Sequence, residues 1–188
     1  MLPEPFDRLP SAALQQRHAR QASAVFRQGD AARGMIFVQS GRVALIRHTE
    51  SGHKVTLHVA GTGDAAAEAS LFSSAYHCDC IAMEDSTVIF LKKTVVMDLI
   101  ASDSEFSTSL MKRFAEQIIG YRRRLELMTI PRAEDRVLAA LADGWLTGSV
   151  MQFASAIGLS HEATYRALSR LVAKGRIKRP VRGRYEPA

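Results

Sequence analysis

Two side chains one helical turn apart have the chemistry to read the edges of DNA bases. Glu162 and Arg166 lie within the stretch IGLSHEATYRALSRLVAKGRI, residues 157–177. A guanidinium is a planar fork that can donate to both O6 and N7 of guanine, and a carboxylate can accept from N4 of cytosine. Residues at i and i+4 share one face of a helix. If this stretch is helical, the pair predicts base recognition in a major groove.

The residues around the pair predict a helix-turn-helix. Gly158 provides a turn, and Ser160 is a favourable N-cap for a following helix. Leu168 and Leu171 lie on the apolar face of that helix, and residues 149–157 contain a second, shorter apolar stripe. A short helix, a turn and a second helix with a polar beginning are typical of this motif. The alternative is an ordinary surface helix with a solvated charged face.

The polar face of the second helix and the cationic tail supply the candidate contacts. Glu162 and Arg166 would read bases, whereas Ser160, Thr164 and the cations would contact phosphates. The expected DNA-binding residues are Ser160, His161, Glu162, Thr164, Tyr165, Arg166, Arg170, Lys178 and Arg179. Apolar residues around a glycine turn in the tail also predict a small two-stranded wing.

The charge of the chain is concentrated in its last third. The net charge is +6 and the isoelectric point is near 9.7. From Pro131 onward there are ten Lys and Arg residues against five acidic residues, which leaves +1 for the first 130 residues. A basic third beside a nearly neutral remainder favours duplex DNA over a membrane as partner.

The remaining compositional signals favour a cytoplasmic protein. No run of about 18 apolar residues predicts a membrane-spanning helix. The N-terminus lacks the basic and apolar regions of a signal peptide. Two closely spaced cysteines do not make a disulfide scaffold, so a reducing compartment is expected.

The first half of the chain has the period of a sheet. Residues 21–92 contain short alternating apolar runs separated by glycine turns, which predicts an antiparallel sandwich or roll. Within it, residues 65–72 favour a short helix. Before it, Ser11 could cap a loosely packed N-terminal helix over residues 12–20.

A long helix is expected between the sheet and the helix-turn-helix. Residues 94–129 read as a short helix followed by a long one that Asp103 or Ser104 could cap. The long helix has apolar residues at spacings of 4, 4, 3, 4 and 3, close to a heptad seam, which are Leu110, Phe114, Ile118, Tyr121, Leu125 and Met128. We expect a dimer interface there; the alternative is packing within the chain. Pro131 then predicts a hinge and the first position of the next helix.

These motifs, in this order, resemble the CRP/FNR family of bacterial transcription regulators. The matching pieces are FRQGD (26–30), IFVQSGRVAL (36–45), GDAAAEASLF (63–72) and the stretch 157–177. The resemblance implies an α+β fold with an antiparallel β-roll of the cyclic-nucleotide-binding type, a long dimerisation helix and a winged helix-turn-helix. The implied domains are 1–102 for the sensor, 103–130 for the dimerisation helix and 131–188 for the DNA-binding domain.

The resemblance also implies a function. It implies a homodimer on a pseudo-palindromic DNA site, with RNA polymerase as a further partner. An enzyme is not expected, because the sequence has no Gly-rich phosphate loop, nucleophile elbow or metal-ligand helix. Family members use Glu and Arg at the positions of Glu162 and Arg166 for base readout, and His161 stands where relatives often carry arginine. A signal at the β-roll would shift the long helix and swing the DNA-binding domains about residues 130–131. The alternative is a sensor or interaction module with little specific DNA binding.

The resemblance does not carry over the usual effector. Cyclic-nucleotide-binding members use a Glu, matched here by Glu68, and an Arg–Ser pair, replaced here by Cys78 and Asp79. An aspartate repels a phosphodiester, so cyclic AMP is not expected. The effector-pocket candidates are Glu68, Ser70, His77, Cys78 and Asp79.

Three interpretations of the segment YHCDC remain open. His77 and Cys78 could ligate haem, Cys78 and Cys80 could form a thiol switch, or the cysteines could be core residues beside a loop histidine. An iron–sulfur cluster needs about four thiolates and is not expected from two cysteines. The histidines do not have the spacing of a zinc site.

Overall fold

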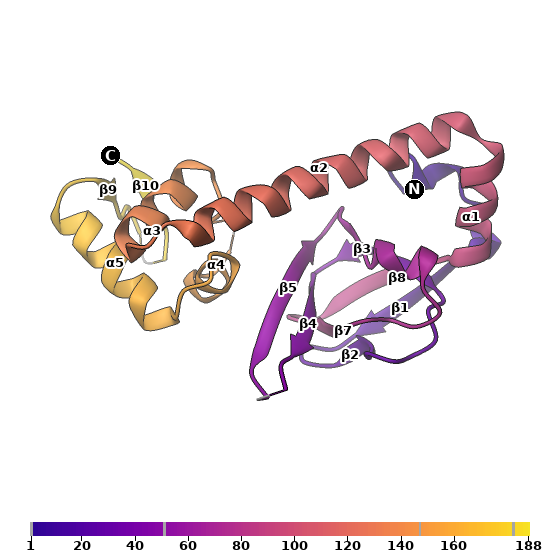
Figure 1. Cartoon of the computed structure of the whole chain (residues 1–188), viewed down its shortest axis with the longest axis horizontal. Helices are drawn as coiled ribbons and strands as arrows, with labels where there is room; N and C mark the ends of the chain where they lie inside the picture. The colour runs from indigo at the N-terminus through magenta and orange to yellow at the C-terminus, as the bar shows by residue number, and fades with distance from the viewer. Residues whose placement is uncertain (1, 51, 147, 182) are drawn as a thin grey trace. The chain divides into compact units, whose positions relative to one another are not determined.

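The structure is a computed structural model that describes residues 2–50, 52–146, 148–181 and 183–188. The chain divides into two compact units, the first ending at Arg113 and the second beginning at Phe114. Figure 1 shows the two roll sheets in the first unit and helices α3 to α5 in the second, while α2 (Ser104–Thr129) contributes to both. Among the described residues no helix is long and apolar enough to cross a membrane.

The strands described in the first unit form two four-stranded antiparallel sheets. One has the order β1-β8-β3-β6, with β1 (Leu14–Ala19), β8 (Ser86–Lys92), β3 (Gly34–Ser40) and β6 (Ala65–Ala66). The other has the order β2-β7-β4-β5, with β2 (Ala24–Phe26), β7 (Asp79–Ala82), β4 (Arg42–His48) and β5 (Lys54–Gly61). Ile36 and Val38 from the first sheet share one buried cluster with Val43 and Leu45 from the second. This arrangement is the antiparallel roll expected from the sequence.

The turn between β3 and β4 requires glycine at position 41. Gly41 has φ +83°, in the left-handed region. A Cβ at this position would lie 2.4 Å from Oγ of Ser86 and 2.7 Å from the carbonyl oxygen of Asp85. The predicted turn is therefore fixed both by its backbone conformation and by the close approach of β8.

The expected N-terminal helix is wrong. Two single turns, η1 (Phe6–Arg8) and η2 (Ser11–Ala13), lead into strand β1, which pairs with β8 along six residues. Long-range strand pairing overrides the weak helical preference of this polar segment. Four of the six residues of β1 are exposed, whereas Phe6 in the preceding η1 is fully buried with its ring 6.1 Å from that of Phe37.

Two helices follow the roll. Helix α1 (Lys93–Ser102) leads to Asp103, whose Oδ1 accepts from the backbone N–H groups of Glu105 and Phe106 at 3.0 Å each. Asp103, one of the two residues expected to cap the long helix, therefore caps α2. The short helix expected over residues 65–72 is confined to η3 (Glu68–Phe72), since the first residues of that range form β6.

The second unit is a small helical core with a two-stranded wing. Its elements are α3 (Ala133–Ala142), α4 (Val150–Ala156), α5 (His161–Ala173), β9 (Ile177–Lys178) and β10 (Glu186–Pro187). Leu127 of α2 is fully buried in the same apolar cluster as Phe153 and Leu168. The predicted α+β class, with a roll, a long helix and a winged helix-turn-helix, is confirmed.

Pro131 does not begin helix α3. The N-cap is Arg132, whose ψ of 125° is extended, and the first helical residue is Ala133. The expectation that proline occupies the first helical position is therefore wrong by two residues. Pro131 instead lies in the short connection after α2 ends at Thr129.

Candidate nucleic-acid interface

Caps and a glycine turn define both helices of the helix-turn-helix. The Oγ of Ser149 accepts from the N–H of Gln152 at 3.2 Å, and the Gln152 side chain accepts from the N–H of Ser149 at 3.0 Å, which is a complete capping box on α4. The Oγ of Ser160 accepts from the N–H of Ala163 at 3.1 Å at the start of α5. Between them Gly158 adopts φ +67°. Local sequence signals therefore set where α5 begins.

Helix α5 separates a buried side from a polar side. Ala167, Leu168 and Leu171 are buried in the core of the second unit. The opposite side is exposed and consists of His161, Glu162, Tyr165, Arg166, Ser169 and Arg170. The residues proposed to read bases are thus presented outward by a helix whose other side is anchored.

Glu162 and Arg166 are available for an external partner. Both are exposed, and within the described ranges neither side chain has a hydrogen-bonding or ionic partner. The sequence allows the two to brace each other, but the structure shows no such bond. Beside them, the ring of His161 meets the ring of Tyr165 edge-on, with centroids 4.6 Å apart, so these two side chains support each other.

Thr164 is not a phosphate contact. It is fully buried, and its hydroxyl donates to the carbonyl oxygen of Ser160 at 3.0 Å. It shares the buried face of α5 with Ala167, Leu168 and Leu171, which pack into the core. The expectation from the sequence is wrong here, because a threonine that bonds to the carbonyl four residues earlier can occupy a buried site.

The cations on the last turns of α5 share an acidic partner that the sequence did not suggest. Glu134 of α3 lies 3.4 Å from Nη1 of Arg170 and 2.5 Å from Nζ of Lys174. The hydrogen bond from Lys174, followed by that from Arg170, lowers the pKa of Glu134 below its ordinary value. Arg170 therefore offers a phosphate less positive charge than an unpaired arginine would.

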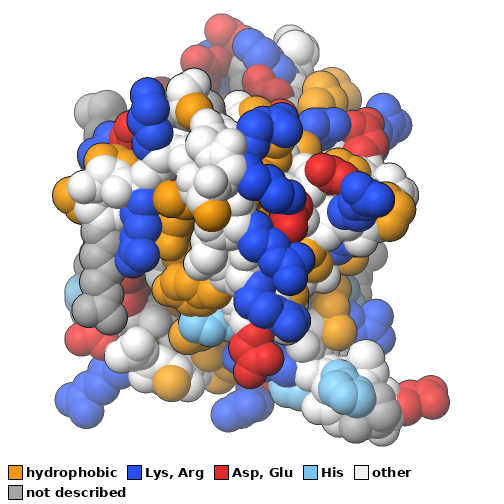
Figure 2. Space-filling model, turned by 90° about the vertical axis from the view of Figure 1, so that its left-hand side faces the viewer, with side chains coloured by type: hydrophobic (Ala, Val, Ile, Leu, Met, Phe, Trp, Pro, Cys, Tyr) orange, Lys and Arg blue, Asp and Glu red, His pale blue; other side chains and the backbone are white. Residues whose placement is uncertain are grey.

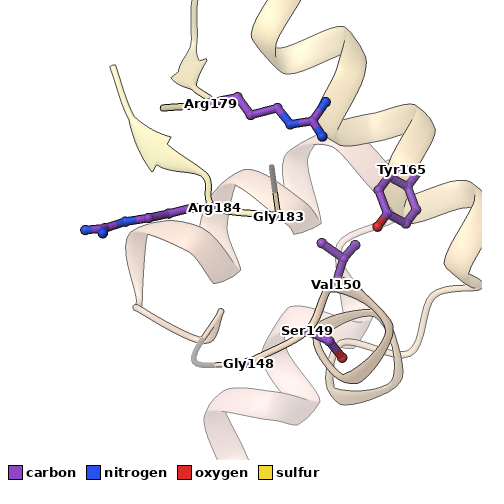
Figure 3. Close-up of a pocket in the computed structure, with 7 residues that line it drawn as sticks. All are labelled: Gly148, Ser149, Val150, Tyr165, Arg179, Gly183 and Arg184. Atoms are coloured by element: carbon purple, nitrogen blue, oxygen red, sulfur yellow. The ribbon is translucent and has the colours of Figure 1, made fainter. Parts of the chain in front are cut away.

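A groove lies between the wing and the two helices of the motif (Figure 3). It has a volume of about 770 Å³ and is lined by Gly148, Ser149, Val150, Tyr165, Arg179, Gly183 and Arg184. The guanidinium of Arg179 lies 5.5 Å above the ring of Tyr185, and Arg184 pairs with Glu186 at 2.8 Å. The sequence did not predict Ser149 and Arg184 as site residues, although Arg184 belongs to the basic tail.

Cationic side chains gather on the surface of the second unit. Figure 2 looks onto this unit and shows Lys and Arg side chains along a nearly continuous band with few acidic side chains inside it. Among the described residues of the wing, the exposed cations are Lys178, Arg179 and Arg184. A cationic surface of this kind attracts the negatively charged backbone of a nucleic acid.

The apolar residues of α2 are mostly exposed. Ile118 is 48% exposed, Tyr121 38%, Leu125 64% and Met128 43%. Leu110 is an exception, because it is 2% exposed and packs within its own unit. The expectation that Leu110 is a dimer contact is therefore wrong. Leu127, which the heptad spacing omitted, is fully buried in the core of the second unit.

The candidate effector residues do not converge on one ligand chemistry. His77 is exposed, whereas the adjacent Cys78 is 2% exposed, so the structure does not bring together the two proposed haem ligands. Asp79 accepts the backbone N–H of Gln28 at 2.8 Å, which gives it a structural role. Ser70 is buried, and within the described residues its hydroxyl has no hydrogen-bond partner.

Both cysteines are core residues of the roll. Cys78 and Cys80 belong to the same buried apolar cluster. Burial raises the pKa of both thiols, with Asp79 adding to the effect at Cys78. A thiol that stays protonated is a poor nucleophile and metal ligand, which favours the core interpretation over a redox switch. No group of three or more potential metal ligands occurs in the part of the chain that the structure describes.

Ala67, just before Glu68, has a left-handed backbone. It is buried with φ +64°, a conformation that costs an alanine free energy and that glycine adopts readily. The turn into η3 therefore holds Ala67 in a strained conformation.

Comparison with known proteins shows which proteins this chain resembles. Residues 16–103 match the family of cyclic nucleotide-binding domains. A protein of Thermus thermophilus described as a cyclic AMP receptor protein is 27% identical over 186 residues, which cover 95% of this chain and 86% of that protein.

Solved structures show the same fold. FixK2 from Bradyrhizobium japonicum superposes with a TM-score of 0.75 at 18% identity, covering 93% of this chain and 92% of that chain. A CRP-family transcriptional regulator, also from Thermus thermophilus, gives a TM-score of 0.68 at 20% identity, covering 91% of each chain. The resemblance to CRP/FNR-family transcription regulators is thereby confirmed.

Proposed function

We propose that this CRP/FNR-type chain is a sequence-specific DNA-binding transcription regulator that acts as a homodimer. The observation that carries the proposal is the outward presentation of Glu162 and Arg166 on α5, one turn apart and without partners among the described residues. A helix with such a face fits the major groove, where both groups find complementary base edges.

The two side chains have separate tasks. Arg166 donates two hydrogen bonds to a guanine, and Glu162 accepts from a cytosine; each good contact contributes about 1–3 kcal/mol of discrimination against a wrong base. His161, held against Tyr165, has a shorter reach than arginine and contributes less to base choice.

The groove between wing and helices would hold the DNA backbone. Arg179 and Arg184 supply cations in the groove, and Ser149 and Tyr165 supply hydroxyl groups at its edge. Lys178 adds an exposed cation on strand β9 of the wing. Contacts of this kind position the protein without reading sequence, and their number sets the salt dependence of affinity.

The dimer forms through α2. Its exposed apolar residues, Ile118, Leu125 and Met128 among them, cannot be buried by the helix alone. Two copies joined in this way would place their recognition helices on half-sites about 34 Å apart, one turn of DNA.

The signal is sensed in the first unit and is not cyclic AMP. The Thermus relative is described as a cyclic AMP receptor protein. In this chain Asp79 stands where a phosphate would need a cation, and its carboxylate accepts a backbone N–H. RNA polymerase is the expected downstream partner.

The test is selection of DNA sites from random duplexes by the purified dimer, followed by titration of the selected site. We expect a pseudo-palindromic site whose affinity falls by about tenfold or more with Arg166→Ala, while affinity for random duplex changes little. Circular dichroism controls for folding. Failure to enrich any sequence would reject base readout and favour an interaction module.

A further inference from the structure

Arg124 connects the long helix to the end of the first helix of the motif. Its Nε donates to the carbonyl oxygen of Ala156 at 2.8 Å, and its Nη2 donates to that of Ser155 at 3.3 Å. Both carbonyls lie at the C-terminal end of α4, where intrahelical donors run out. The side chain is partly buried, and burial lowers its pKa from the ordinary value.

Arg136 of α3 continues this pattern into the turn. Its Nη1 donates to the carbonyl oxygens of Ile157 and Gly158 at 3.2 and 3.3 Å. The same guanidinium donates from Nε and Nη2 to the carbonyl oxygen of Ile130 at 3.0 and 2.7 Å. One side chain therefore joins the residue that follows α2 to the turn that precedes α5.

Taken together, four consecutive carbonyl groups, those of residues 155–158, receive charged donors from two other helices. Hydrogen bonds from a guanidinium are stronger than those between neutral groups. The turn is also closely packed against α2, since a Cβ on Gly158 would lie 3.1 Å from Cε of Met128. Ser160, the cap of α5, comes only two residues later, so the turn determines where α5 points.

We propose that Arg124 and Arg136 are positioning residues for base readout, which fix the turn 155–158 to the end of α2 and thereby set the direction of α5. The proposal rests on the proposed function, in which α5 presents Glu162 and Arg166 to bases. Neither arginine contacts DNA in this role, because both guanidinium groups are engaged with backbone carbonyls.

One consequence concerns movement. Ile130 is held by Arg136, and Leu127 is buried in the core of the second unit. The last turns of α2 and the helix-turn-helix therefore move as one body, and a displacement of these turns is passed directly to α5. The hinge expected at Ile130–Pro131 is opposed by these contacts.

The test compares Arg136→Ala with Arg132→Ala, which removes the same charge from an exposed neighbour. Arg136→Ala should lower affinity for the selected duplex by about tenfold, with affinity for random duplex following the control. Arg136→Lys restores the charge but not the two-way fork, so it should not restore specific affinity. Full rescue by lysine, or an equal loss on both duplexes, would overturn the proposal.

A second readout does not depend on DNA. Hydrogen exchange of amides 159–163 should be faster in Arg136→Ala and Arg124→Ala than in Arg132→Ala, because the turn loses its anchors. Unchanged exchange would reject the positioning role even if DNA binding fell. If the wild-type dimer does not distinguish selected from random duplex, the proposed function fails, while the exchange result still decides whether these arginines fix the turn. Arg124→Ala provides an independent variant should Arg136→Ala not fold.

Discussion

The hydroxyl of Thr164 donates to the carbonyl oxygen of Ser160, 3.0 Å away and one turn earlier in α5. The same carbonyl also accepts from the backbone N–H of Thr164 at 3.0 Å. Thr164 is thus a fully buried residue in a helix whose other side faces solvent. Thr164 therefore stabilises α5 from its buried side, whereas Glu162 and Arg166 lie on its exposed side.

Thr164→Val should leave DNA binding intact. The substitution keeps the shape of the side chain, and the carbonyl of Ser160 retains its backbone donor, so the loss of stability should be about 1 kcal/mol or less. Titration of the selected duplex should give an affinity within about twofold of wild type, compared with the large loss in Arg166→Ala. A large loss with an unchanged melting temperature would show that Thr164 contacts DNA after all.

Glu134→Gln should strengthen binding to all duplex sequences. The variant removes a negative charge and releases Arg170 and Lys174 from their shared carboxylate. Affinity for random duplex should rise and its dependence on salt should steepen. Asp135→Asn is the matched control, since it removes the same charge from the next position of α3. An equal rise in the control would indicate net charge alone.

The same ion pairs predict a pH dependence of stability. The pKa of Glu134 is lowered in the folded state, mainly by Lys174. A lowered pKa means that the carboxylate stabilises the fold at neutral pH and that this contribution is lost as pH falls through the lowered value. The difference in melting temperature between wild type and Glu134→Gln should therefore shrink in acid. A difference that stays constant with pH would contradict the ion pairs.

Ile118→Glu should dissociate the dimer, whereas Ile119→Glu should not. Both isoleucines of α2 are exposed, at 48% and 64%, but successive helical residues are about 100° apart, which places Ile119 away from the predicted seam. Sedimentation equilibrium measures the outcome directly. Dissociation by Ile119→Glu alone would move the interface to another face of the helix.

The two cysteines should be nearly unreactive in the folded protein. Cys78 and Cys80 are buried, and the raised pKa of each means that thiolate forms only above the usual pH range of a free cysteine. A thiol reagent at neutral pH should modify two cysteines rapidly after unfolding and neither beforehand. Oxidants should likewise leave DNA binding unchanged; rapid native modification would revive the thiol-switch interpretation.

The sequence by itself was sufficient for features with local causes. Ser149, Ser160 and Asp103 act as helix caps through atoms two or three residues away, and glycine at position 41 turns the chain where it was expected. The exposed face of α5, with Glu162 and Arg166, follows from helical periodicity. Alternating apolar runs in residues 21–92 predicted a sandwich or roll before the helices, and the family resemblance implied the order of roll, long helix and helix-turn-helix.

Tertiary structure decided every feature that depends on residues distant in the chain. Strand β1 forms because its backbone pairs with that of β8, some seventy residues later in the chain. Glu134 of α3 forms an ion pair with Lys174 at the end of α5. Arg136 donates hydrogen bonds to the carbonyl oxygens of both Ile130 and Gly158. No local sequence pattern predicts these contacts. A side chain's partners depend on which helices pack together, and that packing is set by burial of the whole core rather than by neighbouring residues.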